Sequence, residues 1–280
     1  MLPEGTEELI DRALREDIGP GDHTTLSTIP SDSRGRARLL VKDTGVLAGV
    51  ELAQAIMRRF DPELEPRIFI QDGAIIDRGD IAFTLVGQAR SILTVERLVL
   101  NFMQRMSGIA TLTRKFVDAV EGTGCKVLDT RKTTPGLRAI EKWAVRIGGG
   151  QNHRFGLFDM IMIKDNHVDM AGGIPQAINA ARHYLEIHGL ELPIEIETRN
   201  MQEVALVMRT GGVQRVMLDN FRPEIMTKAV DMIGRRFETE ASGGITLSNV
   251  REYAETGVDM VSVGVLTHGA PSLDLSLKAL

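Results

Sequence analysis

The sequence predicts an α/β protein in two parts, the second of which is a parallel α/β barrel with fewer than eight strands. From Cys125 onward, short apolar runs alternate with helical stretches, and such alternation is typical of parallel sheets. The expected strands are 125–130, 158–165, 193–198, 215–220, 237–242 and 260–264. The expected helices are 136–147, 174–188, 200–210, 223–234 and 247–256. This repeat suits either an open sheet or a barrel short of eight strands.

The residues at the ends of the expected strands favour the barrel. Almost every run ends in polar or charged residues, which would all face one mouth in a barrel but would spread along an edge in an open sheet. They are Asp129 to Lys132, Lys164, Asp165, Glu197, Asp219, Asn220, Ser242, Gly243 and Gly264. No GxGxxG pattern follows a first strand, so nothing in the sequence favours the open dinucleotide-binding sheet.

Residues 1–110 have a different pattern, in which short strands, turns and helices are mixed. We expect helices at 9–15, 51–60 and 94–120, strands at 66–70 and 80–88, and a strand pair within 36–50 that turns near Gly45. These patterns predict an N-terminal domain of residues 1–110 and a barrel domain of residues 111–267. We expect the tail 268–280 to join the N-terminal domain.

The composition indicates an ordinary globular enzyme or binding protein. Apolar residues make up 43% and charged residues 25%, and the net charge of −5 argues against broad binding to nucleic acid. The single cysteine, Cys125, excludes an internal disulfide and fits a reducing compartment. The N-terminal segment lacks the features of a signal peptide, and no apolar run approaches the roughly 20 residues that cross a bilayer. We therefore expect a cytoplasmic protein without a membrane partner.

Glycines follow the last two expected strands. The run 237–242 continues into Gly243 and Gly244, and the run 260–264 ends at Gly264. Loops at these two places in an α/β barrel commonly hold a phosphate, because their backbone N–H groups and a following helix N-terminus face the anion. Plain turn chemistry is the competing interpretation, but the pairing at both places favours a phosphate site.

The segment 129–167 is the densest polar region, and its cationic residues divide into two groups. Arg138, Lys142 and Arg146 recur every four residues on an expected helix, which indicates a solvated face or structural pairing. The other group lies beyond strand ends or after the turn 148–150, and comprises Arg131, Lys132, His153, Arg154 and Lys164. An unpaired buried ammonium is costly, so Lys164 must emerge into the mouth or be paired. Together with the nearby acids, this group suits a polyanionic ligand with a diol or a metal, such as a phosphorylated sugar joined to an anionic partner.

Three runs in this region resemble the core signature of the quinolinate phosphoribosyltransferase family. They are DTRKTTPG at 129–136, GGGQNHRFGL at 148–157 and IKDNH at 163–167. The segments EDIGPGDHTT, ERLVLNFMQRMSGIAT, IEIET, LDNF and ASGGI are also similar to the family and follow in the expected order. The resemblance extends from Glu16 to His268, and the combination of the three core runs is highly specific.

The resemblance implies an N-terminal α/β sandwich domain, a C-terminal barrel of fewer than eight strands, and a homodimer. Whether such dimers pair further into hexamers stays open on the sequence. It implies transfer of phosphoribosyl from phosphoribosyl pyrophosphate to quinolinate, with magnesium. Nicotinate mononucleotide, pyrophosphate and CO2 would be the products, on the route to NAD. The segment 16–25 carries reactive residue types, but we interpret it as a structural helix cap.

The resemblance also implies roles for individual residues. Quinolinate would contact Arg131, His153 and Arg154 of one subunit and Arg97 of its neighbour. Glu197 and Asp219 would hold the ribose hydroxyls, directly or through magnesium, and Glu195 is a less certain second acid on the same strand. Phosphoribosyl pyrophosphate would contact Thr130, Lys132, Lys164, Glu197, Asp219, Ser242, Gly243, Gly244, Val263, Gly264, Val265 and His268. The catalytic set would be Lys132, Lys164, Glu197 and Asp219.

Two other functions remain open on the sequence. Lys164 at a barrel strand end is placed as the lysine of a Schiff-base aldolase would be, although the crowd of arginines in this region makes the aldolase the less favoured function. A divergent paralogue of the same fold, associated with molybdenum transport, would share the resemblance without the activity. Turnover of quinolinate would separate the enzyme from both alternatives.

Overall fold

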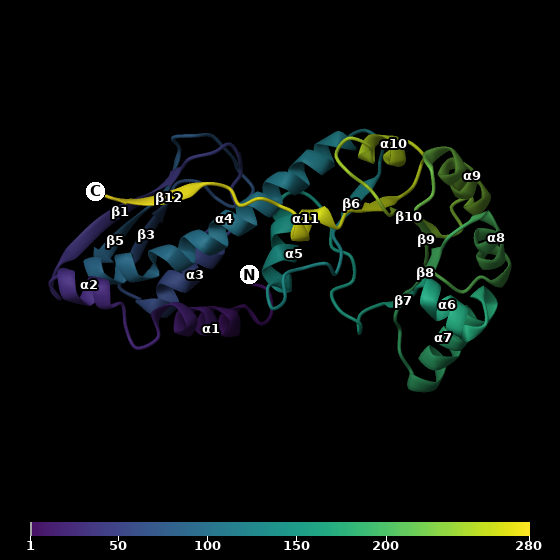
Figure 1. The fold of residues 1–280 in the computed structure, drawn as a ribbon, viewed down its shortest axis with the longest axis horizontal. Coiled ribbons are helices and arrows are strands. Elements are labelled where there is room, and N and C mark those ends of the chain that lie inside the picture. The colour runs from purple at the N-terminus through teal and green to yellow at the C-terminus, as the bar shows by residue number, and fades with distance from the viewer. Residues whose placement is uncertain (1) are drawn as a thin grey trace. The chain divides into compact units, whose positions relative to one another are not determined.

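The computed structural model describes residues 2–280, and its contacts divide the chain into two compact units (Figure 1). The first unit contains the residues up to Arg114 together with Thr133–Gly149 and Leu266–Leu280. The second contains Lys115–Lys132 and Gly150–Val265. The segment Thr133–Gly149, which follows the first expected barrel strand in sequence, thus makes its contacts with the first unit. The predicted α/β class is confirmed, with one antiparallel and one parallel main sheet.

The first unit is built around an antiparallel sheet with the strand order β12-β1-β5-β3. These strands are β12 (Leu275–Ala279), β1 (Arg34–Val41), β5 (Ile81–Gln88) and β3 (Glu65–Ile68). In β1, Ala37, Leu39 and Val41 are buried and alternate with more accessible residues, because successive side chains of a strand point to opposite faces. The C-terminal strand β12 pairs Leu277 with Leu39 and so completes one edge of this sheet.

The expected strand pair within 36–50 is wrong. β1 pairs with β5 and β12, whereas the two-residue strand β2 (Gly45–Val46) pairs with β4 (Ile75–Ile76). The glycine that suggested a turn has another reason to be there, because a Cβ at Gly45 would lie 2.4 Å from the hydroxyl oxygen of Thr111. The same hydroxyl accepts a hydrogen bond from the N–H of Val46 at 2.9 Å, so this glycine permits close approach to a helix.

Helices make up much of the remainder of the first unit. They are α1 (Thr6–Ile18), α2 (His23–Thr28), α3 (Val50–Phe60), α4 (Ala89–Ala119), α5 (Arg138–Ile147) and α11 (Val265–His268), of which α4 and α11 begin or end beyond this unit. The segment 16–25 contains a helix cap, since Asp22 accepts the N–H of Thr25 at 3.0 Å. On α5, Lys142 is buried and not on a solvated face, while the buried Glu141 accepts two hydrogen bonds from Arg105.

The second unit is a six-stranded parallel sheet with helices outside it, in the order β6-β11-β10-β9-β8-β7 (Figure 1). The strands are β6 (Lys126–Leu128), β11 (Met260–Ser262), β10 (Glu238–Ser242), β9 (Arg215–Asp219), β8 (Ile194–Thr198) and β7 (Ile161–Ile163). The helices are α6 (Asp165–Ala171), α7 (Ile174–His188), α8 (Met201–Thr210), α9 (Pro223–Ile233) and α10 (Val250–Ala254). This is the expected barrel-type arrangement with fewer than eight strands.

The core of the second unit consists of aliphatic residues from the strands and the inner faces of the helices. Ile196, Val216 and Leu218 are fully buried, as are Val204 and Val207 of α8. Among the helices of residues 2–280, none combines the length and the apolar character needed to cross a bilayer.

We predict that Gly108→Ala destabilises the protein. A Cβ at Gly108 of α4 would lie 1.9 Å from the carbonyl oxygen of Pro271, so the C-terminal tail would have to move away from the helix. Overpacking of this kind costs about 1–3 kcal/mol, and we expect a lower melting temperature in thermal denaturation. Asn101→Ala, at an exposed position of the same helix, is the matched control and is expected to change stability by less than about 0.5 kcal/mol.

Candidate active site

The parallel ladder brings the predicted site residues of the second unit to one end of its sheet. Pairing is in register from strand to strand, with Ser242 beside Asp219 and Ser262 beside Leu128. The carboxyl ends of all six strands therefore lie together. The predicted residues found there are Thr130, Arg131 and Lys132 after β6, Lys164 after β7, Glu197 on β8, Asp219 on β9, Ser242 to Gly244 at the end of β10, and Val263 to Val265 after β11. Arg97 is exposed on α4 and His268 is exposed at the end of α11, and both belong to the first unit.

Two carboxylates and a lysine form the acidic part of this end of the sheet. The Lys164 ammonium lies 3.8 Å from a carboxylate oxygen of Glu197. Burial, followed by the negative charge of Asp219, raises the pKa of Glu197. Burial also raises the pKa of Asp219, although the amide of Asn220 and the charges of Lys164 and Lys132 oppose the rise. The two acids thus carry negative charge that the neighbouring cations only partly offset.

Asp129 fixes the segment that carries His153 and Arg154. Its buried carboxylate accepts the side-chain amide of Asn152 at 2.5 Å and the backbone N–H of His153 at 2.8 Å. Gln151 also bridges to β6, since its N–H donates to the carbonyl of Val127 at 2.8 Å. The segment after Gly150 therefore runs beside β6 as a short extension of the sheet.

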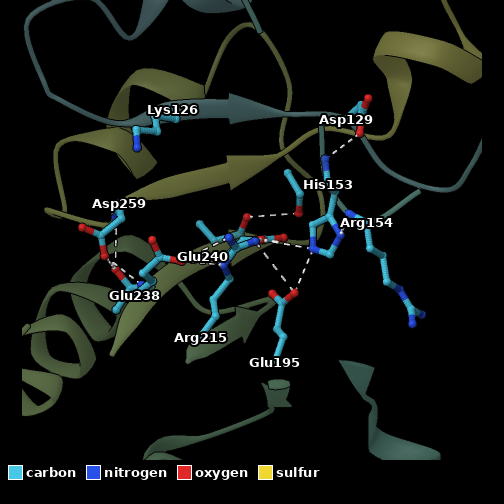
Figure 2. Close-up of polar contacts among 12 residues, drawn as sticks. Lys126, Asp129, His153, Arg154, Glu195, Arg215, Glu238, Glu240 and Asp259 are labelled. Atoms are coloured by element: carbon cyan, nitrogen blue, oxygen red, sulfur yellow. Dashed lines mark hydrogen bonds and ion pairs between the residues drawn. The ribbon is translucent and has the colours of Figure 1, made fainter. Parts of the chain in front are cut away.

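His153 enters the interior of the second unit and contacts two buried acids. Its Nε2 lies 2.9 Å from a carboxylate oxygen of Glu195 and 3.3 Å from one of Glu240. Figure 2 shows both acids beside the imidazole. Burial lowers the pKa of His153, but the hydrogen bonds and charges of Glu195 and Glu240 oppose this effect and raise the pKa above its usual value. Arg215 completes the group, with its guanidinium 3.1 Å from Glu240 and 3.9 Å from Glu195.

Arg154 directs its guanidinium away from this buried group (Figure 2). Its Nη1 donates to the carbonyl of Met160 at 3.1 Å, and the side chain is half-buried. Burial, and after it the positive charge of Arg131, lowers the pKa of Arg154. The positive charge of the two guanidinium groups makes this part of the site suited to an anion.

The glycine loop after β10 packs against Asn220. Gly243 has φ +93°, and a Cβ there would lie 2.1 Å from the side-chain oxygen of Asn220. Asn220 itself has φ +55°, donates its backbone N–H to Ser242 at 2.8 Å, and donates its side-chain amide to Asp219 at 2.6 Å. This residue therefore links the acid Asp219 to the loop that was expected to hold a phosphate.

Several residues of the site were not assigned a role from the sequence, namely Asp129, Asn152, Arg215, Asn220 and Glu240. One of them, Glu240, could have been found from the sequence of β10. Side chains alternate between the two faces of a strand, so Glu238, Glu240 and Ser242 share a face. The expected site residue Ser242 identifies that face as the interior one. Nothing comparable indicates Asn152, whose position depends on a hydrogen bond to a residue 23 positions away.

We predict that Asp219→Asn stabilises the protein at alkaline pH. Because the folded state raises the pKa of Asp219, its ionised form costs stability above that pKa, and the cost disappears as the carboxyl is protonated on acidification. The side chain is half-exposed, so the gain is screened and corresponds to roughly 2 °C or less in melting temperature at about pH 8.

The difference in melting temperature between Asp219→Asn and the parent protein is expected to narrow toward about pH 4. Asp231→Asn, an exposed acid on α9, is the control that should show no such pH-dependent difference. A lower melting temperature of Asp219→Asn at alkaline pH would contradict the prediction.

Comparison with known proteins covers almost the whole chain. Residues 22–107 match the model described as quinolinate phosphoribosyl transferase, N-terminal domain, and residues 109–278 match that of the C-terminal domain. The chain is 46% identical to quinolinate phosphoribosyltransferase [decarboxylating] 1b of Nicotiana tabacum over 96% of its own length and 81% of the relative's. It is 41% identical to a probable nicotinate-nucleotide pyrophosphorylase [carboxylating] of Synechocystis, over 95% of this chain and 89% of the relative.

Solved structures agree with these relatives. The structure of NadC from Streptococcus pyogenes superposes with a TM-score of 0.94 at 38% identity, over 100% of this chain and 99% of that one. A nicotinate-nucleotide pyrophosphorylase from Francisella tularensis gives a TM-score of 0.92 at 36% identity, over 98% and 96% of the two chains. Both domain models, the relatives and these structures agree with the resemblance carried by the strand-end motifs, and the chain belongs to the quinolinate phosphoribosyltransferase family.

Proposed function

We propose that the strand-end site of this enzyme joins quinolinate to phosphoribosyl pyrophosphate and releases pyrophosphate and CO2, giving nicotinate mononucleotide for NAD biosynthesis. The observation that carries the proposal is the separation of charge at one end of the parallel sheet. Arg131 and Arg154 repel each other there, and Glu197 lies beside Asp219 near Lys164. A dianionic acid and a sugar with its leaving group require these two environments side by side.

The quinolinate pocket of this proposal is the cationic part of the site. Quinolinate has two adjacent carboxylates, and Arg guanidinium groups suit bidentate carboxylate binding. Arg131 and Arg154 would take the carboxylates and His153 would line the pocket beneath them. Arg97 of a neighbouring subunit would complete the pocket in a homodimer, which could assemble further into hexamers.

The other substrate would lie across the acidic part of the site and the glycine loops. Lys132 and Lys164 would offset the charge of the pyrophosphate, and Glu197 and Asp219 would accept hydrogen bonds from the ribose hydroxyls. The 5′-phosphate would be held by backbone N–H groups, for which the positive φ angles of Gly243 and Gly244 are suited. The residues proposed for this substrate are Thr130, Lys132, Lys164, Glu197, Asp219, Ser242, Gly243, Gly244, Val263, Gly264, Val265 and His268.

Magnesium fits the acidic part of the site. Mg²⁺ prefers oxygen ligands and usually binds one or two carboxylates together with substrate phosphates. Glu197 and Asp219 are such carboxylates, and the raised pKa of each indicates that its negative charge is incompletely compensated by the protein. When bound, the ion would neutralise charge on the departing pyrophosphate.

The reaction then depends mainly on position. The quinolinate ring nitrogen attacks the anomeric carbon as the bond to pyrophosphate breaks, through an oxocarbenium-like state that Glu197 and Asp219 stabilise electrostatically. The ring nitrogen becomes cationic, so the electron pair left when the adjacent carboxylate departs as CO2 is stabilised on the ring carbon, which then takes up a proton. No covalent enzyme nucleophile is needed, and the two anions must be held in line.

Lys164 does not match the requirements of a Schiff-base lysine. Its side chain is 49% exposed and its ammonium is near Glu197, whereas such a lysine is typically desolvated or surrounded by cations. The location predicted from the sequence, the cytoplasm, stays a prediction, and a similar protein of Arabidopsis thaliana bears the word chloroplastic in its name.

An assay with two acids tests the proposal directly. We expect turnover of quinolinate with phosphoribosyl pyrophosphate, measured as nicotinate mononucleotide and CO2 released in equal amounts. Nicotinate lacks one carboxylate and would leave a guanidinium unpaired, so its kcat/KM is expected to be at least about a thousandfold lower. Absence of quinolinate turnover would refute the proposal and favour the divergent, molybdenum-associated paralogue.

Mixed dimers test the proposed sharing of Arg97. Arg97→Ala and Arg131→Ala are each expected to be nearly inactive, because each removes a carboxylate contact from every site. In a mixed dimer one site regains both arginines, so random reassociation after mild unfolding restores about a quarter of the parent activity. A mixture that stays as inactive as its components would show that Arg97 does not act across subunits, and self-mixing of each variant is the control.

A further inference from the structure

The interior of the second unit contains four charged groups where a barrel core is usually apolar. Glu195 and Glu240 are fully buried, His153 is 7% exposed and the Arg215 side chain is 15% exposed. Burying ions costs several kcal/mol each unless they are well paired, and replacing buried ion pairs by apolar side chains is often stabilising. The retention of such a group beneath the proposed quinolinate pocket therefore requires an explanation other than stability.

The geometry of the group centres on the imidazole of His153 (Figure 2). Glu195 and Glu240 approach the same ring nitrogen, Nε2, from different strands, β8 and β10. Arg215 on β9, the strand between them, contacts both carboxylates and holds them in place. Two acids within 3.3 Å of one ring nitrogen restrain the orientation of the ring.

The fixed ring in turn restrains the residue that follows it. The backbone N–H of Arg154 donates to Nδ1 of His153 at 2.7 Å, which requires the imidazole tautomer with its proton on Nε2, and the backbone N–H of His153 donates to Asp129 at 2.8 Å. The chain is thereby held on both sides of the Cα of His153. From there the Arg154 side chain extends away from the buried group, toward its contact with the carbonyl of Met160.

A metal ion is the competing explanation for this group. Single ligand atoms of His153, Glu195 and Glu240 lie within 4.8 Å of one another, as they would around an ion. The guanidinium of Arg215 already provides a positive charge to both carboxylates, at 3.1 and 3.9 Å. An added divalent cation would be repelled by it, so we interpret the group as an ion-pair network.

We propose that Glu195 and Glu240, held by Arg215, are positioning residues that act through His153 to fix Arg154 in the quinolinate pocket. This inference rests on the proposed function, because it assigns the network to the binding of one substrate of that reaction. The ion pairs of the network join Glu195, Glu240, Arg215 and His153 beneath the proposed quinolinate pocket, so the network should influence the binding of quinolinate more than that of the other substrate.

The test compares steady-state kinetics of Glu195→Gln and Glu240→Gln with those of the parent. Each variant preserves side-chain shape but removes one buried charge that orients the ring. We expect the KM for quinolinate to rise about tenfold or more, with kcat and the KM for phosphoribosyl pyrophosphate changed by less than about threefold. A role in folding alone would lower the melting temperature and the yield of active enzyme but would leave the quinolinate KM of the folded fraction unchanged.

Glu238→Gln is the matched control. Glu238 contacts the same guanidinium, at 3.1 Å, but its side chain is 55% exposed and it pairs with Arg215 rather than with His153. Its quinolinate KM is expected to equal that of the parent. Parent enzyme without quinolinate turnover would refute the proposed function, whereas active parent enzyme with unchanged KM values in both Gln variants would refute only this inference.

A double-mutant cycle tests whether the acids act through His153. In a His153→Ala background, Glu195→Gln and Glu240→Gln should each produce no further rise in quinolinate KM, because the ring they orient is gone. Additive effects would overturn the inference, as would a stoichiometric metal ion in the purified parent that Glu240→Gln loses. If a single variant does not fold, the double variant Arg215→Gln/Glu240→Gln takes its place in the cycle, because it removes one charge of each sign.

Discussion

In-register parallel pairing of six short strands is the constraint on which the proposed site depends. The strands contribute aliphatic residues such as Ile196 and Val216 as well as the buried charges, and most of the residues proposed to bind substrates lie where the strands end. If one strand slipped by one residue, its interior side chains would point toward the helices instead. The polar residues at its carboxyl end would then no longer reach the proposed site. Residues an even number of positions apart on one strand therefore face the interior together, even where their proposed roles differ. Glu195 and Glu197 on β8 are one such pair, and Arg215 and Asp219 on β9 are another.

The charges at this end of the second unit are arranged in layers. The deep layer contains Glu195, Glu240, Arg215 and His153, which pair with one another inside the barrel. The upper layer contains residues that are exposed or half-exposed and that retain net interaction with a ligand, among them Lys164 and Asp219. The ion pairs of the deep layer can therefore fix the positions of the residues in the upper layer. The residues of the upper layer stay hydrated until substrates bind.

Sequence patterns predicted the fold class and most elements because both depend on local periodicity. Helix α3 and strand β5 follow from the spacing of their apolar residues, and β8 follows from the run IEIET. The hairpin near Gly45 was wrong because a glycine that permits close packing on a helix is indistinguishable, in sequence, from one that permits a turn. The motif residues Lys164 and Glu197 could be assigned to one end of the sheet, whereas the roles of Asp129 and Arg215 depend on partners far along the chain.

The contact between Asn220 and Gly243 links two positions that the ladder brings side by side. The asparagine side chain occupies the space that any larger residue at 243 would need, and its own left-handed backbone favours Asn or Gly over other residues. Neither position is then free to vary alone. Among relatives, an alanine at 243 would be compatible only with a shorter side chain at 220, so the two sites should covary over evolutionary time.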